Sequence, residues 1–386
     1  MSDVSACYIH VPFCRARCRY CDFFSITDTS LIEPYVDALV REIRQRGKKD
    51  CRVETVYLGG GTPSLLGPRL VEKILGAVFT CFDLPENPEV TVEVNPGTVD
   101  RGYFDDLLSI GVNRVNIGVQ SFDDEKLGFL GRIHSAREGK RAVESALDAG
   151  IGNTGMDMIY CIPSEDAGLW AGDLATACSY SPAHLSCYTL TFEKDTCLYR
   201  MMKQGRTRPM DKESAADLFM DTVRILTKAG YLHYEISNFA KDAASRSRHN
   251  MTYWRNSPYL GFGAGAHSFD GAARYWNRKN VHRYIRELEA GKKPDFASEA
   301  LTTEQKLLEA VMLGLRTMEG IDVNLMERLL CMDFSTFFSP LPQRLEQNAM
   351  AVSGRDGFRL TPKGMCRLDS IVSGFADRIL AATFSS

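Results

Sequence analysis

The stretch Cys14-Arg-Ala-Arg-Cys18-Arg-Tyr-Cys21 places three thiols on one short segment, separated by three and then by two residues. It follows an apolar run from Cys7 to Phe13, which predicts a strand that ends just before the first of these thiols. Three cysteines on one loop can hold three corners of a [4Fe–4S] cluster and leave the fourth iron open to another ligand. The stretch therefore predicts an iron–sulfur site directly after the first strand.

A zinc knuckle is the alternative, because closely spaced cysteines are also typical of structural zinc sites. A closed zinc site needs four ligands, and no second cysteine pair or Cys/His pair at zinc-finger spacing follows downstream. The chain has 12 cysteines, and those outside the stretch are scattered along it. We interpret them as ordinary core or surface residues, which favours the iron–sulfur site.

Length and composition limit the class of protein. A chain of 386 residues fits one large domain with a smaller one, and 44% hydrophobic residues are ordinary for a globular protein. The net charge of −3 gives no reason to expect nucleic acid as a partner. No apolar run approaches the ~20 residues of a transmembrane helix, and the first residues lack a secretory signal pattern. We expect a cytoplasmic protein and leave peripheral membrane association and a homodimer open.

Strand-like runs alternate with helical patterns over the first half of the chain, which is typical of successive βα units with a parallel sheet. The helix that starts at the capping box Ser135–Glu138 and stops at Gly150 is one example. Six such units predict a partial (β/α)6 TIM-like barrel over residues 1–230. An aromatic and Gly-rich extension over 231–300 and a small α+β accessory domain over 301–386 would follow. The expected strands are Tyr8–Val11, Thr55–Leu58, Val90–Val94, Arg114–Val119, Met156–Tyr160 and Leu185–Leu190.

Polar motifs fall where these strands end, which is the rim that carries the chemistry in (β/α) barrels. The second strand ends in Gly59-Gly-Gly-Thr-Pro-Ser64, a turn whose missing Cβ atoms allow a ligand to approach the backbone. Glu93 lies on the third strand, where a carboxylate needs either a salt bridge or a cationic ligand. Gln120, Arg132 and Asp157 follow on the fourth and fifth units, and together these side chains predict one binding rim.

The motifs Cys14 to Cys21, Gly59 to Ser64, Gly131 to His134, Tyr234-Glu-Ile-Ser-Asn-Phe-Ala240 and Gly314-Leu-Arg316 together resemble one group of radical S-adenosylmethionine (SAM) proteins. That group contains oxygen-independent coproporphyrinogen III dehydrogenase and its relatives the heme chaperones. The resemblance covers nearly the whole chain. It implies one-electron reduction of the sulfonium of S-adenosylmethionine by the cluster.

The resemblance also implies roles for individual residues. Cys14, Cys18 and Cys21 would ligate the cluster, and S-adenosylmethionine would chelate the fourth iron. Further positions match contacts to S-adenosylmethionine in the dehydrogenase; whether one or two molecules bind here stays open. The positions around the first molecule are Tyr8, Gly60 and Glu93, and those around the second are Tyr20, Gly61, Thr62, Gln120, Arg132 and Asp157.

Two departures from the dehydrogenase pattern favour the chaperone branch. Phe23 stands where the dehydrogenase has a fourth cysteine, and the first strand begins by Tyr8 without the dehydrogenase's N-terminal extension. In addition, His249-Asn-Met-Thr-Tyr-Trp254 resembles the heme-binding motif of the chaperones, with His249 as the implied iron ligand. Considered by spacing alone, the same motif indicates a packed histidine among core aromatics. His267 is either a second heme contact or, more simply, a hydrogen-bonded structural histidine.

The resulting hypothesis is a heme chaperone that binds heme and a [4Fe–4S] cluster and transfers heme to apo-hemoproteins such as respiratory enzymes. The alternative is oxidative decarboxylation of coproporphyrinogen III propionates. Arg15, Arg17 and Arg19 alternate with the cysteines, and one hypothesis is that they form a docking patch for an acidic electron donor of the flavodoxin or ferredoxin type. Solvated surface charges are the simpler interpretation of the same arginines.

Overall fold

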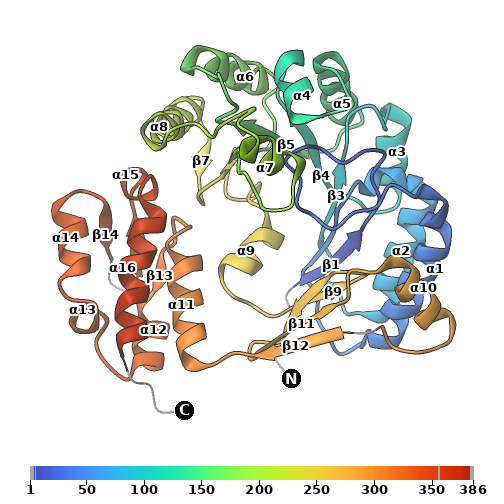
Figure 1. Ribbon diagram of the computed structural model, residues 1–386. Coiled ribbons are helices and arrows are strands. Elements are labelled where there is room, and N and C mark those ends of the chain that lie inside the picture. The colour runs from blue at the N-terminus through green and yellow to red at the C-terminus, as the bar shows by residue number, and fades with distance from the viewer. Residues whose placement is uncertain (1–3, 5, 295, 355–356, 383–386) are drawn as a thin grey trace.

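The computed structural model describes residues 4, 6–294, 296–354 and 357–382. Its centre is a set of six parallel strands, each followed by one or more helices (Figure 1). The first and sixth of these strands do not pair with each other. The first pairs on its outer side with β9 (Tyr259–Phe262) and the sixth with β8 (Asn238–Ala240), so the six strands form an open, partial barrel. The strands are β1 (Ala6–Val11), β2 (Thr55–Gly60), β3 (Glu89–Val94), β4 (Arg114–Gln120), β5 (Asn153–Tyr160) and β6 (His184–Thr189).

Helices cover the outer face of the barrel, and several begin and end where the sequence predicts. The capping box between Ser135 and Glu138 is present at the start of α5 (Ala136–Asp148), and Gly47 caps α1 (Ile32–Arg46). The other helices of this part are α2 (Gly67–Cys81), α3 (Arg101–Ser109), α4 (Asp124–Leu130), α6 (Ala167–Ser179), α7 (Cys197–Lys203) and α8 (Lys212–Lys228), with the short 3₁₀ helices η1 (Thr29–Leu31) and η2 (Pro63–Leu65).

Residues 231–300 extend the barrel sheet at both edges. Strands β8 and β7 (Leu232–His233) add antiparallel to β6, while β9 adds parallel to β1. Beyond β9 follow β10 (His267–Phe269), β11 (Ala273–Asn277) and β12 (Phe296–Ala300), all antiparallel. The three-part division of the sequence stays a prediction, because this extension shares one 12-stranded sheet with the barrel. Its helices are α9 (Arg248–Trp254) and α10 (Val281–Glu289).

The two faces of the barrel strands differ in chemistry. Outward side chains such as Ile9, Leu58 and Val92 are fully buried in one hydrophobic core against the helices. Inward side chains are polar or aromatic, including Tyr57 and Asn116. Parallel strands in a barrel are usually apolar on both faces, because both are buried. A polar interior under a well-packed outer layer therefore marks the lumen as the place to look for a site.

The C-terminal part is a separate small α+β layer with its own hydrophobic core, in agreement with the sequence (Figure 1). The motif Tyr234–Ala240 joins it to the barrel, since Ile236 N–H donates to Arg316 O (2.8 Å) and Met318 N–H to Tyr234 O (3.0 Å). None of the described helices combines the length and the hydropathy that crossing a membrane requires. The elements are α11 (Thr303–Gly314), β13 (Ile321–Asp322), α12 (Val323–Leu330), α13 (Phe334–Phe337), α14 (Leu341–Gln347), β14 (Ala351–Ser353), β15 (Gly357–Leu360), α15 (Pro362–Met365) and α16 (Leu368–Ala381).

Candidate functional site

The cysteine loop leaves β1 and crosses the mouth of the barrel. Backbone hydrogen bonds fasten its ends, from Cys14 N–H to Ile26 O (2.9 Å) and from Ile26 N–H to Pro12 O (2.7 Å). Its middle rests on the end of α4, because Arg19 N–H donates to Leu130 O (3.0 Å) and the Arg19 side chain donates to Phe129 O (3.1 Å). The loop is thus held at the carboxyl ends of the strands, as expected.

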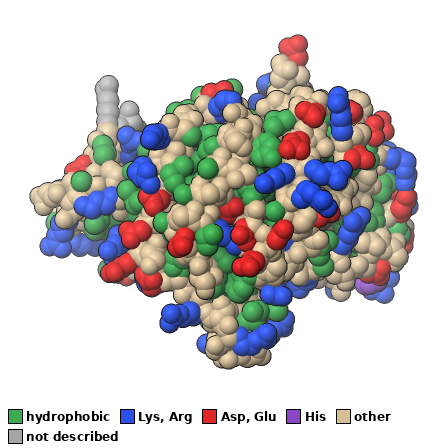
Figure 2. Space-filling view, turned by 90° about the horizontal axis from the view of Figure 1, so that it is seen from above, with side chains coloured by type: hydrophobic (Ala, Val, Ile, Leu, Met, Phe, Trp, Pro, Cys, Tyr) green, Lys and Arg blue, Asp and Glu red, His purple; other side chains and the backbone are tan. Residues whose placement is uncertain are grey.

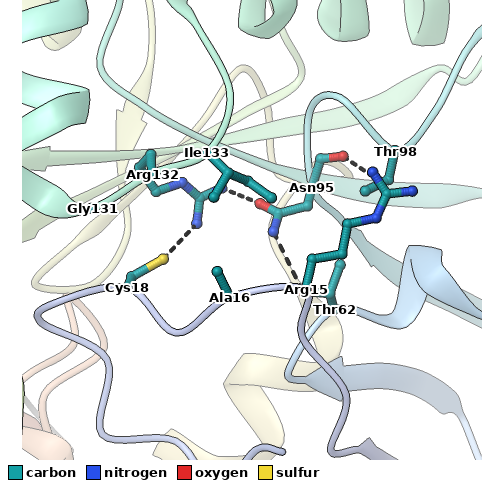
Figure 3. A pocket seen from close by; sticks show the side chains of 9 residues that line it. All are labelled: Arg15, Ala16, Cys18, Thr62, Asn95, Thr98, Gly131, Arg132 and Ile133. Carbon is teal, nitrogen blue, oxygen red and sulfur yellow. Dashed lines mark hydrogen bonds between the residues drawn. The ribbon is translucent and has the colours of Figure 1, made fainter. Parts of the chain in front are cut away.

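Two hydrogen-bond donors of the rim reach sulfur atoms of this loop. Thr62 Oγ1 lies 3.5 Å from Cys14 Sγ, and Arg132 Nη1 lies 3.5 Å from Cys18 Sγ. Asn95 connects the two donors, because its amide contacts both the Thr62 hydroxyl and the Arg132 guanidinium (Figure 3). A pocket lies beside the loop. It is lined by Cys18, Thr62, Asn95 and Arg132 together with Arg15, Ala16, Thr98, Gly131 and Ile133.

The donor set of the loop fits an iron–sulfur cluster better than a closed zinc site. Cys14 is buried, while Cys18 and Cys21 are half-buried, and burial raises the pKa of the Cys21 thiol to about 11. Across the described residues, no three His, Cys, Asp or Glu side chains converge as metal ligands, so the three thiols share a loop without meeting at one point. Three thiols with N–H and O–H donors aimed at sulfur match the surroundings of a cluster, since hydrogen bonds to sulfur tune its potential. Arg132 Nε is also buried without a partner, which leaves one further donor at the pocket wall.

The glycine turn after β2 brings backbone against the end of β1. Gly60 has φ +114°, and a Cβ there would lie 2.4 Å from the His10 ring. At Gly61 a Cβ would lie 2.6 Å from Phe13 O, and Gly61 N–H donates to Val11 O (2.8 Å). Only glycine fits both positions, and this close approach exposes the Gly60 N–H to the lumen.

That N–H donates to Glu93, the carboxylate at the centre of the lumen. Glu93 accepts hydrogen bonds from Gly60 N–H (3.0 Å) and from the Tyr57 hydroxyl (2.8 Å). Burial raises the pKa of Glu93 to about 7, and the nearby Asp157 charge adds to the rise while the two donors oppose it. Tyr8 lies alongside, with its ring stacked on Tyr57 at 6.2 Å between centroids. Among the residues that the structure describes, no Lys or Arg pairs with this carboxylate, which suits it to a cationic ligand group.

The polar side of the rim comes from β4 and β5. Gln120 is buried and has φ +68°, a left-handed conformation that is rare outside glycine. Asp157 accepts a hydrogen bond from Asn116 (2.7 Å), and burial raises its pKa to about 6. Tyr20 lies near Arg132, whose charge opposes the rise that burial produces in the pKa of Tyr20. The structure therefore brings the expected rim residues together around the pocket and Glu93.

His249 lies away from this rim, at the N-terminal ends of the strands. It is buried, and both ring nitrogens have partners, Thr55 Oγ1 at 2.8 Å and the Tyr253 hydroxyl at 2.9 Å. Its ring stacks on Tyr57, and burial lowers its pKa to about 3. The backbone N–H groups of Arg248 and His249 donate to Glu89, so α9 is fixed under the barrel. In this conformation His249 offers no free nitrogen to heme, whereas His267 is exposed and stacks on Trp276.

Sequence reasoning assigned no role to Tyr57, Asn95 and Asn116, which link the expected residues to one another. The alternation of the strands contains the signal. Tyr57 on β2 is paired with Tyr8 on β1, and Asn116 on β4 is paired with Glu93 on β3. Paired residues of neighbouring strands point to the same side of the sheet, so both members of each pair face the lumen.

The arginines of the cysteine loop do not all behave as surface charges. Arg15 and Arg17 are exposed, whereas Arg19 is half-buried and bound to α4. Phe23, beside the loop, is 62% exposed. Seen from above, basic side chains of the molecule are interspersed with acidic and apolar ones (Figure 2).

An open βα barrel with three cysteines on the loop after β1 and a glycine turn after β2 defines the class of radical SAM proteins. Residues 8–169 match the model of the radical SAM superfamily, and residues 301–366 match the HemN C-terminal domain. Coproporphyrinogen III oxidase (HemN) from Escherichia coli, described as a radical SAM enzyme, has the same fold. Its TM-score is 0.81 at 22% identity, over 97% of this chain and 90% of that one.

Within this class, the sequence comparisons select one branch. The chain is 36% identical over 326 residues to the heme chaperone HemW of Synechocystis sp., covering 82% of this chain and 79% of that protein. It is 32% identical to the heme chaperone HemW of Lactococcus lactis, covering 93% and 94%. The chain belongs to the heme chaperone HemW family. The family assignment, the partial barrel and the α+β accessory domain expected from the sequence are thereby confirmed.

Proposed function

We propose that this protein binds heme and transfers it to apo-hemoproteins in the cytoplasm, with an iron–sulfur cluster and S-adenosylmethionine at the barrel mouth. Membership of the HemW family carries this proposal. Phe23 supports it, because an exposed phenylalanine stands at the position of the fourth cysteine of the dehydrogenase group.

The residues of the mouth divide the work of holding the cofactors. Cys14, Cys18 and Cys21 would hold the cluster, and Thr62 and Arg132 would donate hydrogen bonds to its sulfur atoms. When bound, the cluster supplies single electrons to the sulfonium of S-adenosylmethionine. The protein's part is to bind, to orient and to exclude water.

The remaining rim residues would hold S-adenosylmethionine. Glu93, with Gly60 and Tyr8 beside it, would take the amino group, because it is a half-buried carboxylate to which no described Lys or Arg is paired. On the other side, Asp157 and Gln120 offer acceptors and donors to ribose hydroxyls, and Tyr20, Gly61, Thr62 and Arg132 would close the site. An electron donor of the flavodoxin or ferredoxin type would dock over Arg15 and Arg17.

Heme is assigned to His249, and this assignment requires a movement. A heme iron would take the Nε2 atom only after the hydrogen bond to Tyr253 opens. Tyr253→Phe removes that hydrogen bond and keeps the ring that packs against His249 at 5.0 Å. The pair of substitutions His249→Ala and Tyr253→Phe therefore separates ligation from packing.

The test is an anaerobic heme titration of the reconstituted protein, followed by absorption spectroscopy. We expect His249→Ala to lose the spectrum of the ligated heme, Tyr253→Phe to bind at least as tightly as wild type, and His267→Ala to bind unchanged. Loss of heme ligation in His267→Ala, with ligation unchanged in His249→Ala, would show that the exposed His267 is the heme ligand. Turnover of coproporphyrinogen III in the same preparation would refute the chaperone function in favour of oxidative decarboxylation.

A further inference from the structure

Three charged side chains are buried together behind the rim, and none of them belongs to the site described above. Lys126 on α4 places its Nζ atom 2.5 Å from Glu165 Oε1 and 3.0 Å from Asp173 Oδ2. The side chains are 7%, 0% and 4% exposed, respectively. Burying charges costs desolvation free energy that ion pairing only partly returns, so such a group is weak evidence for a role in stability alone.

The two carboxylates hold the backbone just after the ends of two neighbouring strands. Asp173 accepts hydrogen bonds from the Ser121 hydroxyl (2.7 Å) and from Phe122 N–H (2.8 Å), directly after Gln120. Glu165 accepts a hydrogen bond from Ile162 N–H (3.2 Å), directly after Cys161.

A residue with positive φ stands at the end of β4 and another directly after the end of β5. Gln120 has φ +68° and Cys161 has φ +62°, and neither is glycine. Such conformations persist only where the surroundings enforce them, and they gather at functional sites. The hydrogen bonds that Asp173 and Glu165 accept fix the backbone directly after these two positions, and Lys126 holds the two carboxylates together.

The lysine also connects this point to the cysteine loop. It lies on α4, whose last residue, Leu130, accepts the hydrogen bond from Arg19 N–H. Two residues further, Arg132 donates to Gly118 O (2.8 Å) on β4 and reaches Cys18. One ammonium group therefore ties together the Gln120 turn, the Cys161 turn and the helix that presents Arg132.

We infer that Lys126, through Asp173 and Glu165, is a positioning residue for S-adenosylmethionine on the Gln120 and Arg132 side of the mouth. It does not touch the ligand; it fixes the strand ends that do. The inference rests on the proposed binding of S-adenosylmethionine. Removing the ammonium group should weaken that binding at least tenfold while the iron and sulfide content stays at the wild-type value.

The experiment compares Lys126→Met with Arg46→Met in the anaerobically reconstituted full chain. Arg46 is the matched control, because it is a largely buried cation that pairs with buried Glu42 (2.6 Å) and binds Gly261 O, away from the rim. Equilibrium binding of S-adenosylmethionine and its effect on the electron paramagnetic resonance spectrum of the reduced cluster are measured beside thermal unfolding. We expect both variants to lose stability and only Lys126→Met to lose affinity and the spectral change.

Ser121→Ala provides a second variant that buries no unpaired charge. It removes one hydrogen bond to Asp173, and we expect a loss of affinity of about threefold, the ratio that corresponds to a typical hydrogen bond at the low end of its range. A folded Lys126→Met with wild-type affinity overturns the inference, and so does unchanged affinity in Ser121→Ala if Lys126→Met fails to fold. Wild-type protein that binds no S-adenosylmethionine would instead refute the proposed function.

Discussion

If Glu93 binds the amino group of S-adenosylmethionine as proposed, we predict that this binding depends on pH near neutrality. Burial raises its pKa to about 7, so the carboxyl group is half ionised at pH 7 and about one-tenth ionised at pH 6. The amino group of the ligand, with a reference pKa of about 7.7–8.0, stays mostly protonated over this range. Because the ammonium group pairs with the ionised carboxylate, affinity should fall about fivefold between pH 7 and pH 6.

The sign follows from the direction of the pKa shift. A raised carboxyl pKa favours the protonated form in the free protein, so binding releases a proton and strengthens as pH rises through about 7. His10, next to Gly60, has a pKa lowered to about 4 by burial and stays neutral throughout. Asp157, with a pKa of about 6, is also partly protonated as the pH falls from 7 to 6. Its protonation should add to the loss of affinity for S-adenosylmethionine.

Glu93→Gln tests the assignment. The amide keeps an acceptor for Gly60 N–H and Tyr57 but has no charge, so affinity should be lower by about tenfold or more, which is the usual value of a charge-assisted hydrogen bond. Its residual pH dependence should come from Asp157 alone. The assay is equilibrium dialysis of labelled S-adenosylmethionine under anaerobic conditions at pH 6.0, 6.5 and 7.0. The reasoning would be refuted if the affinity of the wild type did not change between pH 6.0 and 7.0, or if the affinity of Glu93→Gln changed with pH as steeply as that of the wild type.

Three further predictions concern the loop, the glycine turn and the accessory domain. Cys18→Ala should lose nearly all iron after reconstitution, measured by iron and sulfide analysis, whereas exposed Cys331→Ala should retain it; equal iron in both would contradict the cluster site. Gly60→Ala should unfold at lower temperature and bind S-adenosylmethionine more weakly, because φ +114° and the His10 ring leave no room for a Cβ. Gly76→Ala, in a helix with open space around it, should raise the free energy of unfolding by about 0.5–1 kcal/mol. A destabilisation there as large as that of Gly60→Ala would count against the steric argument. Phe375→Ala should cost about 3–5 kcal/mol in denaturant unfolding of the accessory domain, since the ring is fully buried among Phe334, Phe338 and Phe358. Leu380→Ala on the same helix, 58% exposed, should change it by less than about 0.5 kcal/mol, and similar losses in both would place the core elsewhere.

The central barrel was predictable because its strands carry local signals. Runs such as Val90–Val94 are bounded by turn residues, and the helix at Ser135 has a capping box, so neighbouring residues specify both. Strands β7 to β12 are two to five residues long, and β9 pairs with β1 across more than 250 residues. No local pattern encodes such a pairing, so residues 231–300 read as irregular.

The candidate site divides in the same way. The cysteines and glycines were found because their chemistry dictates residue type and spacing. The surroundings of His249 could not be predicted from the sequence. Its partner Thr55 is 194 positions away, and its burial depends on Glu89, which accepts hydrogen bonds from the start of α9. The lumen residues Tyr57 and Asn116 had a usable signal in strand alternation, and the environment of Lys126 had none, since its two carboxylates come from distant elements.

The placement of α9 gives the barrel a floor. Tyr253 and His249 occupy the end of the lumen opposite the cysteines, where the His249 ring stacks on Tyr57. If His249 ligates heme as proposed, the macrocycle would approach from this end, where the backbone N–H groups of α9 bind Glu89. The proposed heme and S-adenosylmethionine sites would then lie at opposite ends of the barrel, joined by the contacts from Glu93 to Tyr57 and from Tyr57 to His249.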